Sequence, residues 1–177
     1  MRSQQGKQSE PSAAILDSQS VKTAEGGAQR GFDEGKKVTG RKRHVLVDSF
    51  GLALLVIGTA GSVQDREETK QLLKALVERI VGWRRLQVFW ADGGYWGSLI
   101  DWVRCAFGWT LQIVEKLSDQ AGFQVLPKRW IVERTFVWLN RQRRLGKDYE
   151  RLSQTSDVFI NVAMIRLMLK RLASTHA

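Results

Sequence analysis

The order of its apolar segments constrains the fold of this chain more than any other sequence feature. Two apolar runs flank DSFG in HVLVDSFGLALLVIG, residues 44–58, and this pattern predicts a β-hairpin. An earlier strand is predicted at residues 13–21, and two later strands at 86–92 and 110–116. Hairpin strands are antiparallel, whereas strands joined through a helix are parallel. The sequence therefore predicts one mixed sheet of five strands.

Four further segments have helical character. Residues 64–81 place apolar side chains on one face, with Asp65 as the expected N-cap and Glu68 three residues later. The other three helices are predicted at residues 98–108, 129–145 and 156–173. The order β-β-β-α-β-α-β-α-α best matches the ribonuclease H-like fold, which belongs to the α/β class and has a mixed five-stranded sheet flanked by helices. We expect the apolar face of the last helix to pack on the core rather than on a partner.

The remaining segments lack apolar periodicity. Residues 1–12 are polar and are predicted to be disordered, so that the folded domain spans residues 13–177. Residues 24–43 are rich in glycine and basic side chains, which predicts a long mobile loop. Residues 117–127 predict a second loop that ends at a proline.

Composition excludes several classes of protein. The 177 residues contain no apolar run long enough to span a membrane, and the N-terminus does not resemble a secretory signal. We therefore expect a cytoplasmic protein. One cysteine, Cys105, and two histidines, His44 and His176, make a zinc site improbable, so any metal must be held by carboxylates, which suit Mg²⁺ or Mn²⁺.

The charge of the chain favours an anionic partner. Lysine and arginine number 28 against 18 acids, a formal net charge of +10. Nucleic acid is the commonest partner of so basic a protein, and the basic residues also cluster.

Two acids stand at strand positions where a bare carboxylate is unusual. Asp17 lies inside the first apolar strand, and Asp92 ends the strand LQVFWAD before two glycines. In a ribonuclease H-like sheet these strands are parallel neighbours, so the two carboxylates would lie close together and repel each other. A divalent cation would resolve that conflict. Glu133 is the candidate third ligand, with Arg129 one helical turn before it on the same face.

Each of these acids also has a structural interpretation. The structural alternatives are a strand-edge or turn acid for Asp17, a turn residue before Gly-Gly for Asp92, and a helix-surface residue paired with Arg129 or Arg134 for Glu133. The three acids together, at these fold positions, favour the metal site. Near it, Trp96 and Trp130 are candidates for stacking on a base.

Several long motifs are similar to those of one known family. They are ILDSQSVKT, GKKVTGRKRHVLVDSFGL, VQDRE, WADGGY, LPKRWIVERTFVWLNRQRRLGKDYE and AMIRLMLKRL. Together they resemble the bacterial insertion-sequence transposases of the DDE class, and most closely the group called insertion sequence family five. The resemblance extends from about residue 15 to residue 173.

The resemblance implies that Asp17, Asp92 and Glu133 are the catalytic and metal-binding triad. The family's tyrosine–arginine–glutamate–lysine signature is matched by Arg129 and Glu133. Its outer positions depart, because Leu126 replaces the tyrosine and Asn140, followed by Arg141, replaces the lysine. Such transposases usually carry an N-terminal helical region that recognises the terminal inverted repeats, and this sequence starts almost at the first aspartate. We expect it to be a downstream reading-frame product or a truncated copy.

The implied activity is metal-dependent DNA cleavage and strand transfer. Two Mg²⁺ or Mn²⁺ ions about 4 Å apart would be held by the triad, and an in-line attack on a phosphodiester would follow. The partners would be double-stranded DNA, both terminal inverted repeats and target, and further copies of the chain in a synapse. The residues expected to contact DNA are Lys36, Lys37, Arg41, Lys42, Arg43, Asn140, Arg141, Arg143 and Arg144. The alternatives are a nuclease of the same fold without strand transfer, and a truncated remnant that only binds DNA or a partner.

Overall fold

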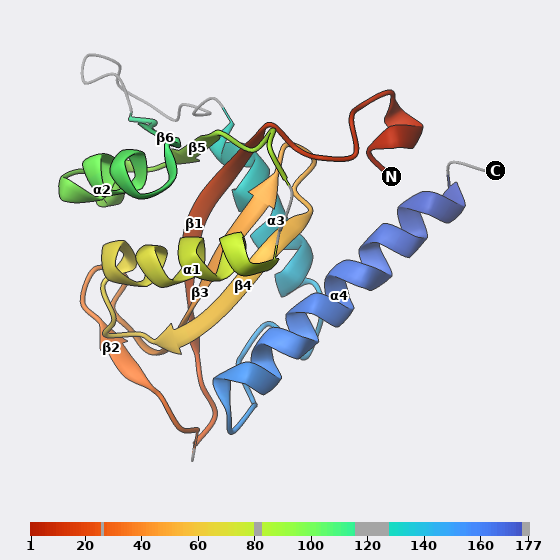
Figure 1. Ribbon diagram of the computed structural model, residues 1–177. Helices are drawn as coiled ribbons and strands as arrows, with labels where there is room; N and C mark the ends of the chain where they lie inside the picture. Colours follow the sequence, from red (N-terminus) through yellow and green to blue (C-terminus); the bar gives the residue numbers. More distant parts are fainter. Residues whose placement is uncertain (26, 80–82, 116–127, 175–177) are drawn as a thin grey trace, which may run out of the picture.

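The computed structural model describes residues 1–25, 27–79, 83–115 and 128–174. It is a three-layer arrangement, with a twisted sheet between two pairs of helices (Figure 1). The strands are β1 (Ala13–Lys22), β2 (Gly31–Asp33), β3 (Val38–Asp48), β4 (Ala53–Ala60), β5 (Val88–Ala91) and β6 (Thr110–Ile113). The α-helices are α1 (Asp65–Arg79), α2 (Ser98–Phe107), α3 (Arg129–Asn140) and α4 (Ser153–Ser174), and the short 3-10 helices are η1 (Ser3–Gln5) and η2 (Gly93–Tyr95).

The sheet has the mixed topology that the sequence predicts. β3 pairs antiparallel with β1 and β4, while β1 with β5 and β5 with β6 are parallel pairs. The five main strands therefore run in the order β4-β3-β1-β5-β6, and the ribonuclease H-like α/β fold is confirmed. The sheet also contains a sixth strand, because the three residues of β2 pair with the first residues of β3 beyond the end of β4.

Alternation along β1 sends its side chains to two separate apolar clusters. Ala14 and Leu16 join the cluster under α1 and α2. Ile15 joins the opposite cluster, which α3 and α4 cover. Because successive strand side chains alternate between the two faces, Asp17 belongs to the face that carries α3. Asp17 therefore lies on the face of the sheet that is covered by α3, the helix that carries Glu133.

The prediction of one long loop at residues 24–43 is wrong in part, because β2 spans Gly31–Asp33 and β3 begins at Val38. This part of β3 has no apolar periodicity, since Arg41, Lys42 and Arg43 are buried there with polar partners. The hairpin turn predicted at DSFG is present between β3 and β4.

The end of the third helix and the N-terminal segment also differ from the prediction. The third helix stops at Asn140 rather than continuing to residue 145, because the chain turns there and buries Leu145. Residues 1–12, expected to be disordered, include η1, and Arg2 forms an ion pair with Asp48 at 2.7 Å. The loop expected at residues 117–127 lies outside the described residues.

Helix α4 contacts the core through one narrow side. It buries Ser153, Ser156, Ile160 and Met164 and packs mainly against β4. The expected core contact is therefore present, but Val158, Val162, Ile165 and Leu169 are more than half exposed. None of the helices in the described part of the chain is both long and apolar enough to span a bilayer.

Candidate catalytic site and nucleic-acid interface

The site forms where two parallel strands end beneath the first turns of α3. Asp17 lies within β1, two residues beyond the Ile15–Trp90 pairing that joins β1 to β5. Asp92 follows the last residue of β5 and caps η2, since its Oδ1 accepts a hydrogen bond from the Gly94 amide at 2.9 Å. Parallel pairing brings both acids to the same edge of the sheet. The two acids differ in burial: Asp17 is only 9% exposed, whereas the side chain of Asp92 is 31% exposed.

A single atom of Arg129 connects the three predicted acids. Arg129 Nη2 lies 3.7 Å from Asp17 Oδ2, 3.5 Å from Asp92 Oδ2 and 3.6 Å from Glu133 Oε1. Because all three oxygens lie within 3.7 Å of one nitrogen atom, the three carboxylates face a common point. The structure thus brings together all four residues that the sequence predicted for the centre of the site.

Burial makes the ionised form of Asp17 costly. Desolvation is the main cause that raises the pKa of Asp17 to about 6, and the neighbouring Asp92 raises it further. A hydrogen bond from the Ser18 amide and the charges of Arg129 and Lys36 oppose this rise in pKa. Burial followed by the charges of Asp17, Asp65 and Asp92 also raises the pKa of Tyr95, which lies beneath the site. This region therefore favours an added positive charge.

The donor set fits a hard divalent cation. Carboxylate oxygens are the ligands that Mg²⁺ and Mn²⁺ prefer, and such an ion would relieve the repulsion between Asp17 and Asp92. Within the described residues, no three or more His, Cys, Asp and Glu side chains are already spaced as a metal-binding cluster. The guanidinium group of Arg129 instead occupies the space among the acids. Binding of a cation would thus require Arg129 Nη2 to move away from the carboxylates.

Comparison with known proteins assigns the family. Residues 8–168 match the family described as "Transposase DDE domain". The chain belongs to this transposase family. A relative from Burkholderia cepacia, named "Putative transposase for insertion sequence element IS402", is 30% identical over 128 residues. That alignment covers 70% of this chain but only 60% of the relative.

A solved structure of a transposase is also similar. It is the cryo-EM structure of the piggyBac transposase synaptic complex with hairpin DNA, with 17% identity and a TM-score of 0.40. The match covers 66% of this chain and 25% of that one. Members of the DDE transposase family generally use divalent metal ions, which agrees with the carboxylate donors of the present site.

Three of the basic residues predicted to contact DNA in this transposase domain are buried structural residues. Arg41 and Arg43 are each 1% exposed, and Lys42 is 7% exposed. Arg41 donates to the carbonyls of Ala28, Glu150 and Arg151 and lies 3.2 Å from Asp148. The prediction that these three bind phosphates is wrong, because their charges are directed into the protein.

Lys42 and Arg43 also have polar partners within the protein. Lys42 Nζ donates to the carbonyl of Val63 at 2.9 Å and lies within ion-pair distance of Asp33 and Asp65. Arg43 donates to the carbonyl of Leu145 at 2.7 Å. The side chains thus hold β3 to the segments around it, a role that β-strand periodicity alone does not reveal.

Lys36 lies closer to the acids than its position in a glycine-rich segment suggested. Its Nζ donates to the Ser18 carbonyl at 2.7 Å and reaches Ser18 Oγ at 3.3 Å. Ser18 in turn donates its amide to Asp17 Oδ1 at 2.7 Å. Lys36 is therefore an exposed cation at the margin of the site, positioned by the residue next to Asp17.

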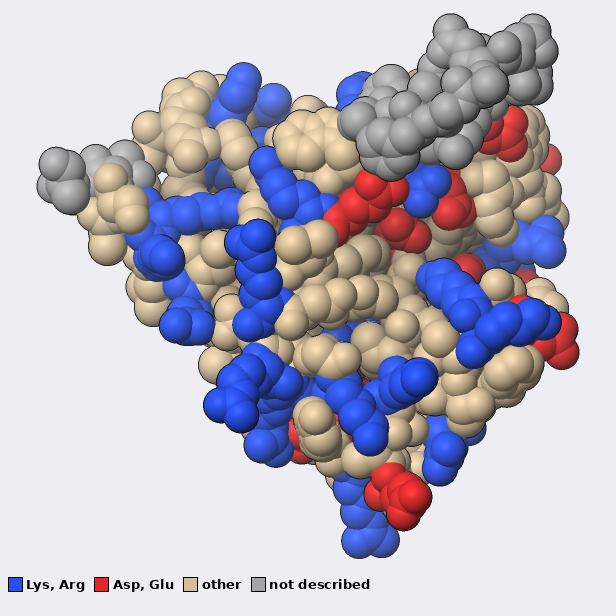
Figure 2. Space-filling view, turned by 180° about the vertical axis from the view of Figure 1, so that it is seen from behind, with Lys and Arg blue, Asp and Glu red and all other residues tan. Residues whose placement is uncertain are grey.

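The remaining predicted contacts lie on the surface. Lys37, Asn140, Arg141 and Arg143 are exposed, whereas Arg144 pairs with Glu150 at 2.8 Å. On the face in Figure 2, acidic side chains gather around a basic one, and many Lys and Arg side chains surround this group. Trp96 and Trp130, the two candidates for base stacking, are 55% and 43% exposed. Arg134 already lies over the Trp130 ring, 4.5 Å from its centre.

Proposed function

We propose that this chain is the catalytic domain of an insertion-sequence transposase of the family-five type. It cleaves DNA and joins the freed 3′ end to target DNA. The observation that carries the proposal is the meeting of Asp17, Asp92 and Glu133 around one atom of Arg129. Membership of the transposase family over residues 8–168 supports the class of reaction.

The three carboxylates are the proposed ligands of two divalent ions, Mg²⁺ or Mn²⁺. When bound, such ions activate the attacking oxygen and stabilise the leaving 3′-oxygen of an in-line displacement. Asp17 supplies the most buried ligand, and its raised pKa means that the ligand set favours an added cation at neutral pH. Glu133, whose side chain is 55% exposed, is the ligand with most freedom to adjust.

Arg129 is the proposed contact to the reacting phosphate. Its Nε is buried and has no hydrogen-bond partner among the described residues. A guanidinium group binds phosphate through two parallel N–H donors, which fixes orientation as well as charge. With a cation held by the acids, Arg129 would be available to orient the phosphodiester and to balance charge on its oxygens.

The proposed partner is double-stranded DNA, both the terminal inverted repeats of the element and the target. Lys36, Lys37, Asn140, Arg141, Arg143 and Arg144 contact its phosphates, which positions DNA without reading its sequence. Two ends must be held together for transposition, so the working form is a homo-oligomer. The proposed location is the bacterial cytoplasm, with the chain associated with the nucleoid when it is bound to DNA.

The substitution Asp92→Asn tests the proposal. We expect Mg²⁺-dependent nicking of a duplex that carries the transposon end to fall by at least about 1,000-fold, because one of three ligands loses its charge. Gel analysis of labelled strands measures nicking, and circular dichroism checks folding. Asp101→Asn on α2 is the matched control, since Asp101 is 71% exposed and pairs only with Arg104 in the described part of the chain.

The products distinguish the alternatives. Nicking without joining of a 3′ end to target DNA would indicate a nuclease of the same fold. A chain that nicks nothing, even when an inverted-repeat-binding region is joined to its N-terminus, would be a DNA-binding remnant and would overturn the catalytic proposal.

A further inference from the structure

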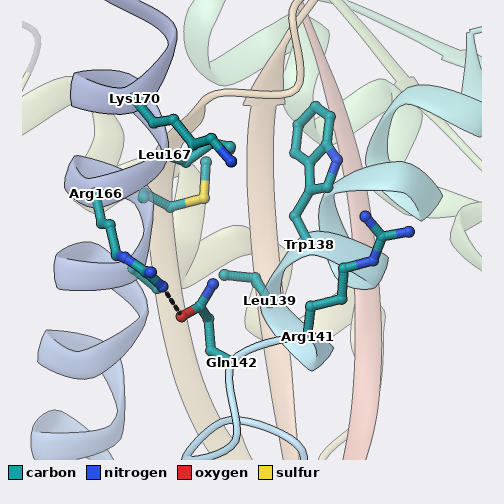
Figure 3. Close-up of a pocket in the computed structure, with 9 residues that line it drawn as sticks. Trp138, Leu139, Arg141, Gln142, Arg166, Leu167 and Lys170 are labelled. Carbon is teal, nitrogen blue, oxygen red and sulfur yellow. Dashed lines mark hydrogen bonds between the residues drawn. The ribbon is translucent and has the colours of Figure 1, made fainter. Parts of the chain in front are cut away.

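A groove between α3 and α4 lies outside the acidic site. Nine residues line it, including Trp138, Leu139 and Gln142 on one side and Met164 and Leu167 on the other. Its volume is about 190 Å³. Figure 3 shows that Arg166 and Lys170 extend from α4 toward the gap, while Arg141 leaves the end of α3 on the opposite side. The groove therefore has an apolar floor and cations on both walls.

The charges of this groove are unbalanced. Three of the nine lining residues are basic and none is acidic. No described acid forms an ion pair with Arg141, Arg166 or Lys170, although acids pair with Arg104 and Arg144 elsewhere on the surface. Arg166 is held instead by a neutral partner, because its Nη1 donates to Gln142 Oε1 at 2.8 Å. A bound anion would thus supply a negative charge that no described side chain supplies to these three groups.

Trp138 forms part of the wall rather than a free stacking platform. Arg134 and Arg171 lie over its ring at 4.7 Å and 4.2 Å from the centre. A nucleobase would have to compete with these guanidinium groups for the Trp138 ring. An apolar floor with cations on its rim suits a sugar–phosphate backbone better, since deoxyribose is largely apolar and each phosphate carries one negative charge.

The groove lies on the same helix as the catalytic candidates. Glu133 and Arg141 are eight positions apart, which corresponds to roughly 12 Å along α3 at 1.5 Å per residue. That length equals about three to four base pairs of B-form DNA, which rises 3.4 Å per pair. A duplex held at the acids would therefore reach the groove within half a helical turn.

We propose that the α3–α4 groove binds the sugar–phosphate backbone of DNA through Arg141, Arg166 and Lys170, next to the duplex segment held at the acidic site. The proposal depends on the transposase function proposed above and extends its DNA contacts to α4. Helix α4 thus has two functions. Its buried side packs against β4, and its basic side forms one wall of the groove.

The test compares two charge-matched double variants of the whole chain. Arg166→Gln with Lys170→Gln removes two groove cations, and Lys74→Gln with Arg79→Gln removes two exposed cations from α1 on the opposite face. Binding to a labelled duplex is measured by fluorescence anisotropy at several salt concentrations in EDTA. We expect the groove variant to lose about 10-fold to 100-fold in affinity and about 2 in the slope of log affinity against log salt. The α1 variant should lose less than about threefold in affinity.

A charge-conserving variant separates charge from folding. Arg166→Lys with Lys170→Arg keeps both cations but replaces the Arg166 contact to Gln142, so it should retain the salt slope of the unchanged chain. Equal slopes for the two Gln variants would overturn the groove assignment. That result would leave the transposase proposal intact if Mg²⁺-dependent nicking persists. A chain with no salt-dependent DNA binding would contradict both proposals.

Discussion

At the scale of single residues, Arg129 has the most consequential position in the site. One guanidinium nitrogen faces three carboxylates within 3.7 Å, and the Arg129 side chain is only 21% exposed. Without it, only the Ser18 amide and the charge of Lys36 would offset the burial of Asp17 and its repulsion from Asp92. Arg129 and a divalent cation therefore stabilise the same acids, and each should reduce the contribution of the other.

Arg129→Gln should make folding stability depend on metal. Without divalent ions we expect the variant to lose about 1–2 kcal/mol of unfolding free energy, since three acids lose their shared cation in a partly exposed site. For a domain of this size the melting temperature would fall by roughly 3–6 °C. Millimolar MgCl₂ should restore more of this loss in the variant than it adds to the unchanged chain.

Thermal melting followed by circular dichroism, with EDTA or MgCl₂, measures this difference. Arg104→Gln on exposed α2 is the control and should shift the melting temperature by less than about 2 °C. Equal melting temperatures for Arg129→Gln and the unchanged chain in EDTA would show that Arg129 does not balance the acids.

The sequence predicted the positions of the acidic residues of the site better than those of the basic residues. Asp17, Asp92 and Glu133 stand out because carboxylates inside or at the end of apolar segments are expensive to leave unpaired. The basic residues carry no such signal, because a buried arginine and a DNA-binding arginine look alike in a glycine-rich segment. Arg41 is internal because the fold brings the carbonyl groups of Ala28, Glu150 and Arg151 to its guanidinium group, and the sequence does not show these contacts.

At the scale of elements, local signals account for what was predicted. The hairpin turn, the apolar face of α1 and the glycine that follows α2 are each encoded within a few residues. The start of β3 and the end of α3 were missed because no change in apolar periodicity marks them. β3 begins where it pairs with β2, and the chain leaves α3 where Leu145 enters the core.

The contact between α4 and β4 contains an acid that titrates abnormally. Burial raises the pKa of Asp157 to about 6, although a hydrogen bond from the Gly58 amide opposes the rise. Because the folded-state pKa exceeds the unfolded value of 3.8, protonation favours the folded chain. The contribution of Asp157 to stability is therefore greatest below about pH 4 and is lost as the pH rises through 6.

Asp157→Asn should consequently stabilise the chain at neutral pH. At pH 7.5 we expect a gain of about 1–2 kcal/mol, discounted for partial exposure, and at pH 5 about half of that gain. Urea unfolding at both pH values measures the difference, with Asp101→Asn as the exposed control. A gain that does not shrink between pH 7.5 and pH 5 would contradict the assignment of the titration to Asp157.

At the scale of the whole molecule, the two faces of the sheet have different tasks. Asp17, Arg129 and Glu133 belong to the α3 face, and the groove cations lie there too. Helices α1 and α2 cover the other face and contribute the larger apolar cluster. A duplex bound on the α3–α4 face would therefore meet the acids and the groove without disturbing the packing of α1 and α2.

This arrangement predicts how the 177-residue chain recognises DNA. Every proposed DNA contact is to the sugar–phosphate backbone, through cationic side chains and the neutral amide of Asn140, so two unrelated duplexes of equal length should bind within about threefold of each other. If six phosphates are contacted, affinity should fall about 1,000-fold between 50 mM and 200 mM salt. Competition of labelled transposon-end DNA with an unrelated duplex measures the first expectation, and salt titration measures the second. A strong preference for the transposon end would show that side chains of this domain read base edges, and an affinity independent of salt would exclude phosphate contacts as its source.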